Sequence, residues 1–131
     1  MNLSSTQPSL LLVEANKCFR QYLKRILDSS VLNIIEAIDG NDASIKYECT
    51  LPELVIVDMH IDNVDGIGLI QKIRSRDLNT KIIALSDEEQ LLKKARQHGA
   101  NEAMLKTFEP AHLVSLLETY VQNHVAVTES A

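Results

Sequence analysis

Short, mostly apolar runs alternate five times with amphipathic helical patterns along this chain. Runs of this length without polar alternation are typical of strands that are buried on both faces. Each segment between two runs is long enough to be a crossover helix that returns the chain to a parallel strand. The order therefore predicts an α/β protein, a single doubly wound (βα)5 fold around a parallel five-stranded sheet. The apolar runs fall at 10–13, 31–36, 54–57, 82–85 and 102–105.

The helices and the domain limits follow from the same pattern. Asn16 can cap the first helix, Gly99 is suited to end the fourth, and Pro110 fits the first turn of the fifth. The apolar spacing and these signals predict helices at 17–27, 42–49, 66–76, 88–98 and from 110 onward. We expect one domain at 9–124, preceded by a tail at 1–8 and followed by a tail or linker at 125–131.

Composition excludes several classes of protein. The net charge is −5, from 18 acidic and 13 basic residues, which argues against direct binding to nucleic acid. The longest apolar runs are far shorter than the ~20 residues that span a bilayer, and no basic stretch precedes the first run, so neither a membrane span nor a signal peptide is expected. Two cysteines do not make a disulfide framework. We therefore expect a cytoplasmic protein.

Polar residues follow the strands at their carboxyl ends, where open parallel sheets place their chemistry. Four predicted strands deliver side chains of complementary chemistry to this edge. The residues are Glu14-Ala15-Asn16 after the first strand, Asp58 after the third, Ser86-Asp87 after the fourth and Lys106-Thr107 after the fifth. Two carboxylates, a hydroxyl and an ammonium are thus expected to share one crevice.

This constellation resembles the receiver domain of two-component response regulators. The resemblance covers about residues 9–124 and is carried by the order and spacing of four stretches. They are 51–58 (Leu-Pro-Glu-Leu-Val-Ile-Val-Asp), Asp65-Gly66, 99–102 (Gly-Ala-Asn-Glu) and 106–110 (Lys-Thr-Phe-Glu-Pro). It implies the flavodoxin-like strand order 2-1-3-4-5, which the alternation of elements alone does not give.

The resemblance also implies a chemistry. Asp58 would accept a phosphoryl group from a histidine kinase or a phosphotransfer protein, assisted by Lys106 and by the Ser86 hydroxyl. Mg2+ would be held by Glu14, Asp58 and the backbone carbonyl of His60. Such a domain is not an enzyme in the ordinary sense, since it catalyses only its own phosphorylation and dephosphorylation. Its further partners would be a C-terminal output domain outside this chain or a second copy in a homodimer.

Five positions depart from the family pattern, among them Asp62, which replaces a common proline in the loop after the third strand. Ala15 replaces the second acid after the first strand, a direct metal ligand, so we expect weaker binding of Mg2+. Ala103 stands where an aromatic residue often couples phosphorylation to the fourth strand. Thr107 replaces the proline after Lys106, and since a cis bond before a non-proline residue costs ~3 kcal/mol, a trans bond is expected. Asp87 replaces a usual alanine and adds negative charge beside the crevice.

Two interpretations remain open, and a third is excluded. The first is a phosphoacceptor with impaired binding of the metal. The second is a pseudo-receiver, which binds a partner protein without being phosphorylated. A phosphatase of the haloacid dehalogenase type would need a second acid two residues after the nucleophile, where this chain has His60.

Overall fold

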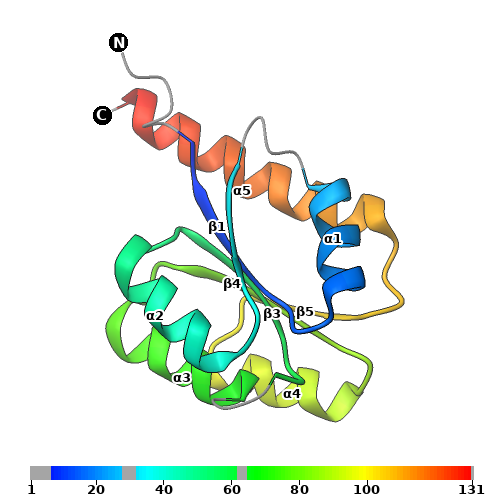
Figure 1. The fold of residues 1–131 in the computed structure, drawn as a ribbon. Helices are drawn as coiled ribbons and strands as arrows, with labels where there is room; N and C mark the ends of the chain where they lie inside the picture. The colour runs from blue at the N-terminus through cyan, green and yellow to red at the C-terminus, as the bar shows by residue number, and fades with distance from the viewer. Residues whose placement is uncertain (1–6, 28–31, 62–64, 131) are drawn as a thin grey trace.

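The computed structural model describes residues 7–27, 32–61 and 65–130, with side chains as far as residue 122. Strands and helices alternate along the whole chain, as the sequence predicts (Figure 1). The strands are β1 (Ser9–Val13), β2 (Asn33–Ala37), β3 (Leu54–Asp58), β4 (Lys81–Ser86) and β5 (Glu102–Leu105). The helices are α1 (Lys17–Ile26), α2 (Gly40–Thr50), α3 (Gly66–Arg76), α4 (Glu89–His98) and α5 (Pro110–Ser130).

The five strands form one parallel sheet in the order β2-β1-β3-β4-β5. This confirms the strand order that the resemblance implies. After β1 the chain moves to one edge of the sheet for β2 and then returns past β1 to β3. The carboxyl ends of β1 and β3 therefore form the topological switch point, where open α/β sheets bind their ligands.

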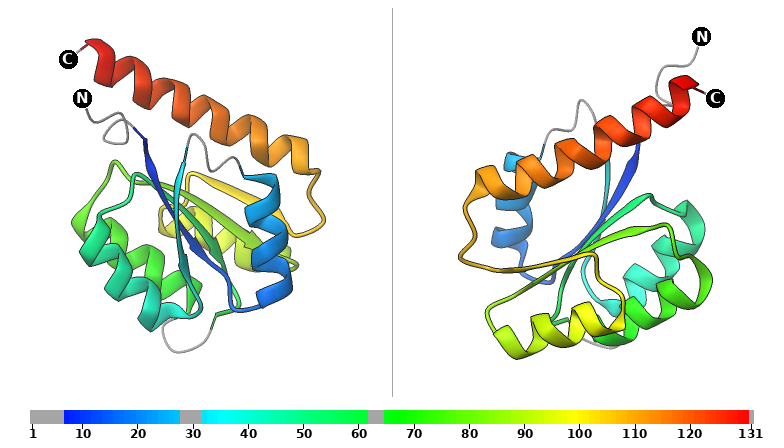
Figure 2. Two further views of the ribbon diagram at one scale, coloured as in Figure 1. Left: turned by 45° about the horizontal axis from the view of Figure 1, so that its top comes forward. Right: turned by 180° about the vertical axis from the view of Figure 1, so that it is seen from behind.

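Helices cover both faces of the sheet. α2, α3 and α4 lie on one face, and α1 and α5 lie on the other (Figures 1 and 2). The buried residues divide in the same way, into one cluster beneath α2, α3 and α4 and a second beneath α1 and α5. The sheet thus separates two apolar cores.

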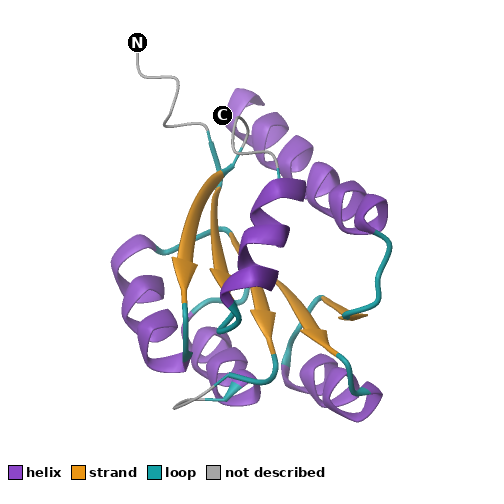
Figure 3. Ribbon diagram, turned by 45° about the vertical axis from the view of Figure 1, so that its right-hand side comes forward, coloured by secondary structure: helices purple, strands orange, loops and turns teal. Residues whose placement is uncertain are grey.

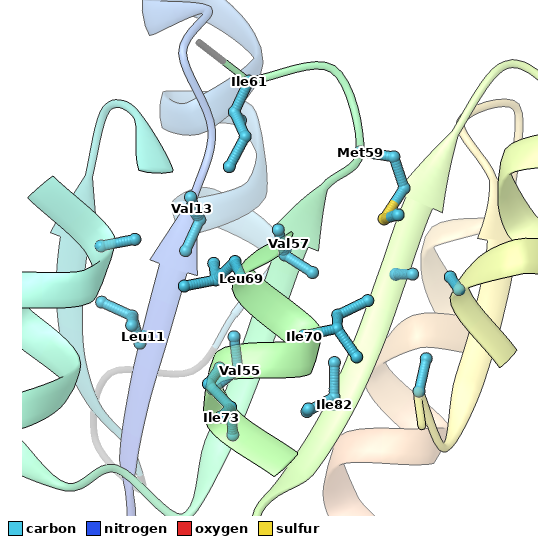
Figure 4. Packing of buried hydrophobic residues seen from close by; sticks show 14 of the residues in the cluster. Leu11, Val13, Val55, Val57, Met59, Ile61, Leu69, Ile70, Ile73 and Ile82 are labelled. Atoms are coloured by element: carbon cyan, nitrogen blue, oxygen red, sulfur yellow. The ribbon is translucent and has the colours of Figure 1, made fainter. Parts of the chain in front are cut away.

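The central strand β3 takes part in both cores. Val55 and Val57 pack in the first cluster, where Leu69 and Ile70 of α3 lie over the sheet (Figure 4). The residues between them, Leu54 and Ile56, belong to the second cluster. A strand that is buried on both faces cannot carry polar residues at alternate positions, which explains the continuous apolar run in its sequence.

Local signals in the sequence set most element boundaries. The Asn16 side chain caps α1 by accepting a hydrogen bond from the Phe19 backbone N–H at 2.8 Å. Gly99 follows α4 at a φ of 122°, a conformation that glycine adopts at little cost. α3 begins at Gly66, where a Cβ atom would lie 2.7 Å from Met59 Cα, so glycine lets the loop after β3 pass close to the helix.

Most boundaries differ from those predicted by one or two residues; α2, for example, spans Gly40–Thr50 rather than 42–49, and α4 begins at Glu89 rather than at 88. Two further differences concern β2 and α5. β2 begins at Asn33 rather than at 31, and residue 31 itself lies outside the described residues. α5 extends past the expected domain limit at 124 and stays helical to Ser130. The physical reason is that 111–130 contains neither glycine nor proline, so no residue there breaks the helix. Within the described residues, no helix combines the length and apolar character that crossing a bilayer requires.

Candidate functional site

The carboxyl ends of the strands meet at one edge of the sheet (Figure 3), and four predicted site residues lie there. Glu14 directly follows β1, Asp58 ends β3, Ser86 ends β4 and Lys106 directly follows β5. The strands also hold the backbone of this edge together. The Lys106 N–H donates to the Ser86 carbonyl at 2.9 Å, and the Glu14 N–H donates to the Ala37 carbonyl at 3.0 Å.

One ammonium group lies between two carboxylates in the crevice. Lys106 Nζ is 2.8 Å from Asp58 Oδ2 and 3.3 Å from Glu14 Oε1. Asp58 is 3% exposed and Glu14 is 1% exposed, whereas the Lys106 side chain reaches solvent. Because a buried carboxylate without a partner is costly, this single cation is what lets two acids share the site.

Backbone N–H groups fix the orientation of both carboxylates. Asp58 Oδ1 accepts a hydrogen bond from the His60 N–H at 3.0 Å. Glu14 Oε2 accepts one from the Asn16 N–H at 3.0 Å. The second oxygen of Glu14, Oε1, is buried and has no hydrogen-bond partner among the described residues, although it makes a charge contact with Lys106.

The charges in the crevice perturb one another. Burial raises the pKa of Glu14, and the neighbouring Asp58 carboxylate raises this pKa further, against the opposing effects of the Asn16 N–H and Lys106. Burial alone would lower the pKa of Lys106, but its hydrogen bond and charge contact with Asp58, together with the charge of Glu14, outweigh burial and raise it. The lysine therefore keeps its charge at neutral pH, and the Glu14 carboxyl is harder to ionise than an exposed glutamate.

Ser86 is completely buried at the end of β4. Its Oγ accepts a hydrogen bond from the Glu88 N–H at 3.0 Å, just before α4. A hydroxyl that accepts in this way keeps its own hydrogen for donation. The contact of Ser86 with Glu88, the residue that precedes α4, is therefore compatible with a donor role of the hydroxyl in the crevice.

An exposed trio of side chains lies at the mouth of the crevice. His60 Nε2 is 2.7 Å from Glu88 Oε2 and 3.3 Å from Asp87 Oδ1. These contacts join the loop after β3 to the loop after β4. They also change the interpretation of Asp87: its carboxylate, which the sequence suggested as a negative charge beside the crevice, faces the His60 imidazole.

Three other departures from the family pattern can be located, whereas Asp62 lies outside the described residues. Ala15 is exposed after β1 and offers no side-chain oxygen. Ala103 lies on β5 beside Ala84 of β4, where two small side chains are paired. The Lys106–Thr107 peptide bond is trans, as the missing proline predicts.

The crevice suits a hard divalent cation, which prefers oxygen ligands. The buried Glu14 Oε1 lacks a hydrogen-bond partner, and the Asp58 carboxylate lies at the same edge of the sheet. Ala15 adds no ligand to this set. The glutamate thus lies where it can supply an oxygen that Ala15 cannot.

Sequence reasoning missed two residues of the site. Lys106 Nζ lies over the Phe19 ring, 4.7 Å from its centroid, although the sequence indicates only an apolar position on a helix. Arg20 donates from Nη1 to the Glu14 carbonyl at 2.8 Å and from Nε to Glu36 at 3.0 Å, which ties α1 to the strand ends. The sequence gives one signal for these contacts, which is that Phe19 and Arg20 lie in the first turn of the helix that follows β1.

A pH-dependent stability follows from the raised pKa of Glu14. A carboxyl whose pKa is higher in the folded than in the unfolded state favours folding in acid and loses that contribution as pH rises through the folded pKa. We therefore expect the free energy of unfolding of Glu14→Gln to increase relative to that of the parent as pH rises from about 4.5 towards 7. The increase should be about 1.4 kcal/mol for each unit by which the pKa of Glu14 is higher in the folded than in the unfolded state. Urea denaturation at several pH values measures this difference.

Glu36→Gln is the matched control. Its hydrogen bond to Lys24 is the largest of the effects that lower the pKa of Glu36, so both the sign and the pH window change: this variant should lose stability relative to the parent as pH rises towards about 4.5, and the difference should level off above that pH. A Glu14→Gln difference that stays constant with pH would show that Glu14 ionises as freely as an exposed glutamate.

Comparison with known proteins agrees with this geometry. The family model of the response regulator receiver domain matches residues 10–118. The chemotaxis protein CheY of Thermotoga maritima is 30% identical over 111 residues, which cover 82% of this chain and 92% of CheY. The transcriptional regulatory protein KdpE of Staphylococcus aureus is 26% identical over 122 residues, which cover 90% of this chain. The match covers 53% of KdpE, so the chain spans about half the length of that relative.

Solved structures share the fold. The receiver domain of NtrX from Brucella abortus superposes with a TM-score of 0.78 at 20% identity, over 86% of this chain and 98% of that one. The chemotaxis response regulator CheY4 of Vibrio cholerae gives a TM-score of 0.77 at 22% identity, over 86% and 98% of the two chains. The family model spans nearly all of the sheet and its helices, and CheY is matched over almost its entire length. The chain therefore belongs to the receiver domains of two-component response regulators.

Proposed function

We propose that this receiver domain is a phosphoacceptor, in which Asp58 takes a phosphoryl group from the phosphohistidine of a histidine kinase or a phosphotransfer protein. The observation that carries the proposal is the 2.8 Å contact between Lys106 Nζ and Asp58 Oδ2 at the buried end of β3. A carboxylate is a weak nucleophile towards an anionic phosphoryl group, so a fixed positive charge beside it is the main requirement.

The chain's own residues have distinct roles in the transfer. A carboxylate oxygen of Asp58 attacks phosphorus, the P–N bond of the donor breaks, and its electron pair stays on the imidazole nitrogen. Lys106 offsets the charge on one phosphoryl oxygen, and the Ser86 hydroxyl donates a hydrogen bond to another. The product is an acyl phosphate on Asp58, which water can later hydrolyse.

Mg2+ belongs to the proposal as an assisting ion. Glu14, Asp58 and the backbone carbonyl of His60 would hold it, and when bound it supplies positive charge to the phosphoryl oxygens. Because Ala15 contributes no ligand, we propose that affinity for Mg2+ is lower than in receivers with an acid at this position. The inward position of Glu14 offsets part of that loss.

The proposal extends to partners and location. The donor is a histidine kinase or a phosphotransfer protein, and the signal passes to an output domain or through a homodimer of this chain. Direct binding to nucleic acid is disfavoured by the net charge of −5. We place the reaction in the cytoplasm, where such kinases present their phosphohistidine.

The test is direct phosphorylation by a small-molecule donor. The protein is incubated with phosphoramidate or acetyl phosphate and Mg2+, and its intact mass is followed with time. We expect one added phosphoryl group, which hydroxylamine removes because it cleaves acyl phosphates. Beryllofluoride should also protect the protein from thermal unfolding in the presence of Mg2+, by mass action. No modification and no protection at saturating donor and Mg2+ would favour the pseudo-receiver, which binds a partner without phosphate.

A further inference from the structure

The ammonium of Lys106 has a third neighbour besides its two carboxylates. Nζ lies 4.7 Å from the centroid of the Phe19 ring, over the ring face. A cation at this distance from an aromatic face is attracted by the negative charge of the π system. The crevice thus surrounds the lysine with two carboxylates and one aromatic ring, and the ring comes from α1 rather than from a strand end.

Three independent contacts fix the position of this ring. The Phe19 N–H donates to the Asn16 cap at 2.8 Å, which sets the backbone at the start of α1. Tyr22, one turn later, stacks on Phe19 with ring centroids 5.8 Å apart and planes at 27°. Phe19 also packs against the core cluster beneath α1 and α5. The ring is therefore held by its helix, by a second ring and by the core before it meets the lysine.

A lysine needs such support more than most charged residues do. Its ammonium is a compact charge on a four-carbon stem with little preference for one orientation. Fixing the stem costs conformational entropy, which a prearranged neighbour reduces at the moment of reaction. Here the side chain reaches solvent and could otherwise leave the crevice when Asp58 becomes phosphorylated and its charge is redistributed.

We propose that Phe19 is a positioning residue that holds the Lys106 ammonium beside Asp58 through a cation–π contact. The inference rests on the proposed phosphoacceptor function and adds to it a residue that touches neither the phosphoryl group nor Asp58. Phe19 acts through the lysine alone. An aliphatic residue of similar volume fills the same space in the core but does not attract the cation.

Phe19→Leu, Phe19→Tyr and Tyr22→Leu test the proposal together. Rates of phosphorylation by acetyl phosphate are measured at saturating Mg2+ over a range of donor concentrations. We expect Phe19→Leu to lower the maximal rate about two- to thirtyfold, which corresponds to the loss of one cation–π contact. Phe19→Tyr keeps a ring face and should restore most of the rate. Tyr22→Leu removes the stacked ring that does not contact the cation, and should change the rate less than Phe19→Leu does.

A spectroscopic measurement reports the contact without any phosphorylation. The Lys106 ε-methylene group is bonded to the Nζ atom that lies over the Phe19 ring, so its protons should resonate upfield of those of other lysines. This shift should disappear in Phe19→Leu and persist in Phe19→Tyr. Leucine fills the space without a ring current, so loss of the shift in Phe19→Leu assigns it to the Phe19 ring, and the phosphorylation rates then test whether that ring positions the cation. The upfield shift of the Lys106 protons can be measured in the unsubstituted protein even if Phe19→Leu folds poorly.

The outcomes separate the two proposals. If the parent is phosphorylated and Phe19→Leu reacts at the same rate, or if the ε-methylene protons show no upfield shift, the role of Phe19 is refuted while the phosphoacceptor function stands. If the parent shows the upfield shift but neither the parent nor any variant is phosphorylated, the phosphoacceptor function is refuted. The positioning role, which rests on that function, is then refuted as well. The inference is supported if Phe19→Leu is phosphorylated more slowly than the parent and Phe19→Tyr recovers most of the rate.

Discussion

Asp58→Asn is expected to abolish phosphorylation completely. An amide has nearly the same shape as the carboxylate but no anionic oxygen to attack phosphorus, so no acyl phosphate can form. The fold should survive, because Lys106 keeps Glu14 as an anionic partner and the substitution removes the repulsion between two buried acids. Peptide mapping by mass spectrometry after treatment with phosphoramidate and Mg2+ measures the effect.

Asp87→Asn is the matched control for this substitution. Asp87 is an exposed carboxylate at the mouth of the same crevice, and it contacts His60 rather than Lys106. The variant should be phosphorylated on Asp58 at least as fast as the parent, since it removes negative charge from the approach of an anionic donor. Modification that persists in Asp58→Asn would assign the acyl phosphate to another carboxylate and refute our choice of nucleophile.

Ala15→Asp is expected to tighten Mg2+ binding about ten- to a thousandfold, equivalent to ~1–4 kcal/mol. The substitution adds a carboxylate next to Glu14, at the end of β1 where Ala15 now offers no oxygen. Without metal, three acids would share the crevice with one lysine. Their repulsion should raise a carboxyl pKa and lower the stability of the metal-free protein.

The signature of this change is a melting temperature that depends on Mg2+ more steeply in Ala15→Asp than in the parent, because the ion stabilises only the state that binds it. Ala15→Asn is the matched control, since it adds a side chain of the same size without charge and should tighten binding far less. If the parent already binds Mg2+ as tightly as Ala15→Asp does, the inward-facing Glu14 has replaced the missing ligand, and the claim of a weakened metal site is wrong.

The main features of the fold could be predicted from the sequence for physical reasons. A strand that is buried on both faces, such as β3, must be continuously apolar, and a helix that covers a sheet must be apolar on one side. Because parallel strands end at one edge, the meeting of Glu14, Asp58, Ser86 and Lys106 also follows from the sequence. The order of the strands came instead from the resemblance to a family, since alternation alone does not say which strands are neighbours.

Contacts between side chains of different elements could not be predicted in this way. Phe19 occupies an ordinary apolar position of α1, and nothing in the periodicity indicates that its ring faces Lys106. Asp87 follows a strand like the other site residues, yet its carboxylate turns to His60. Such choices depend on the distance between loops that are remote in sequence, which a pattern of residue types does not contain.

The double burial of β3 has a mechanical consequence for Asp58. Amide groups in a strand covered on both faces exchange their hydrogens with solvent only through openings that break up most of the domain. Asp58 ends this strand, whereas Lys106 and His60 lie on the connecting loops beyond the strands. The proposed nucleophile is therefore attached to a rigid strand. Any conformational change that follows addition of a group to Asp58 must occur in the surrounding loops.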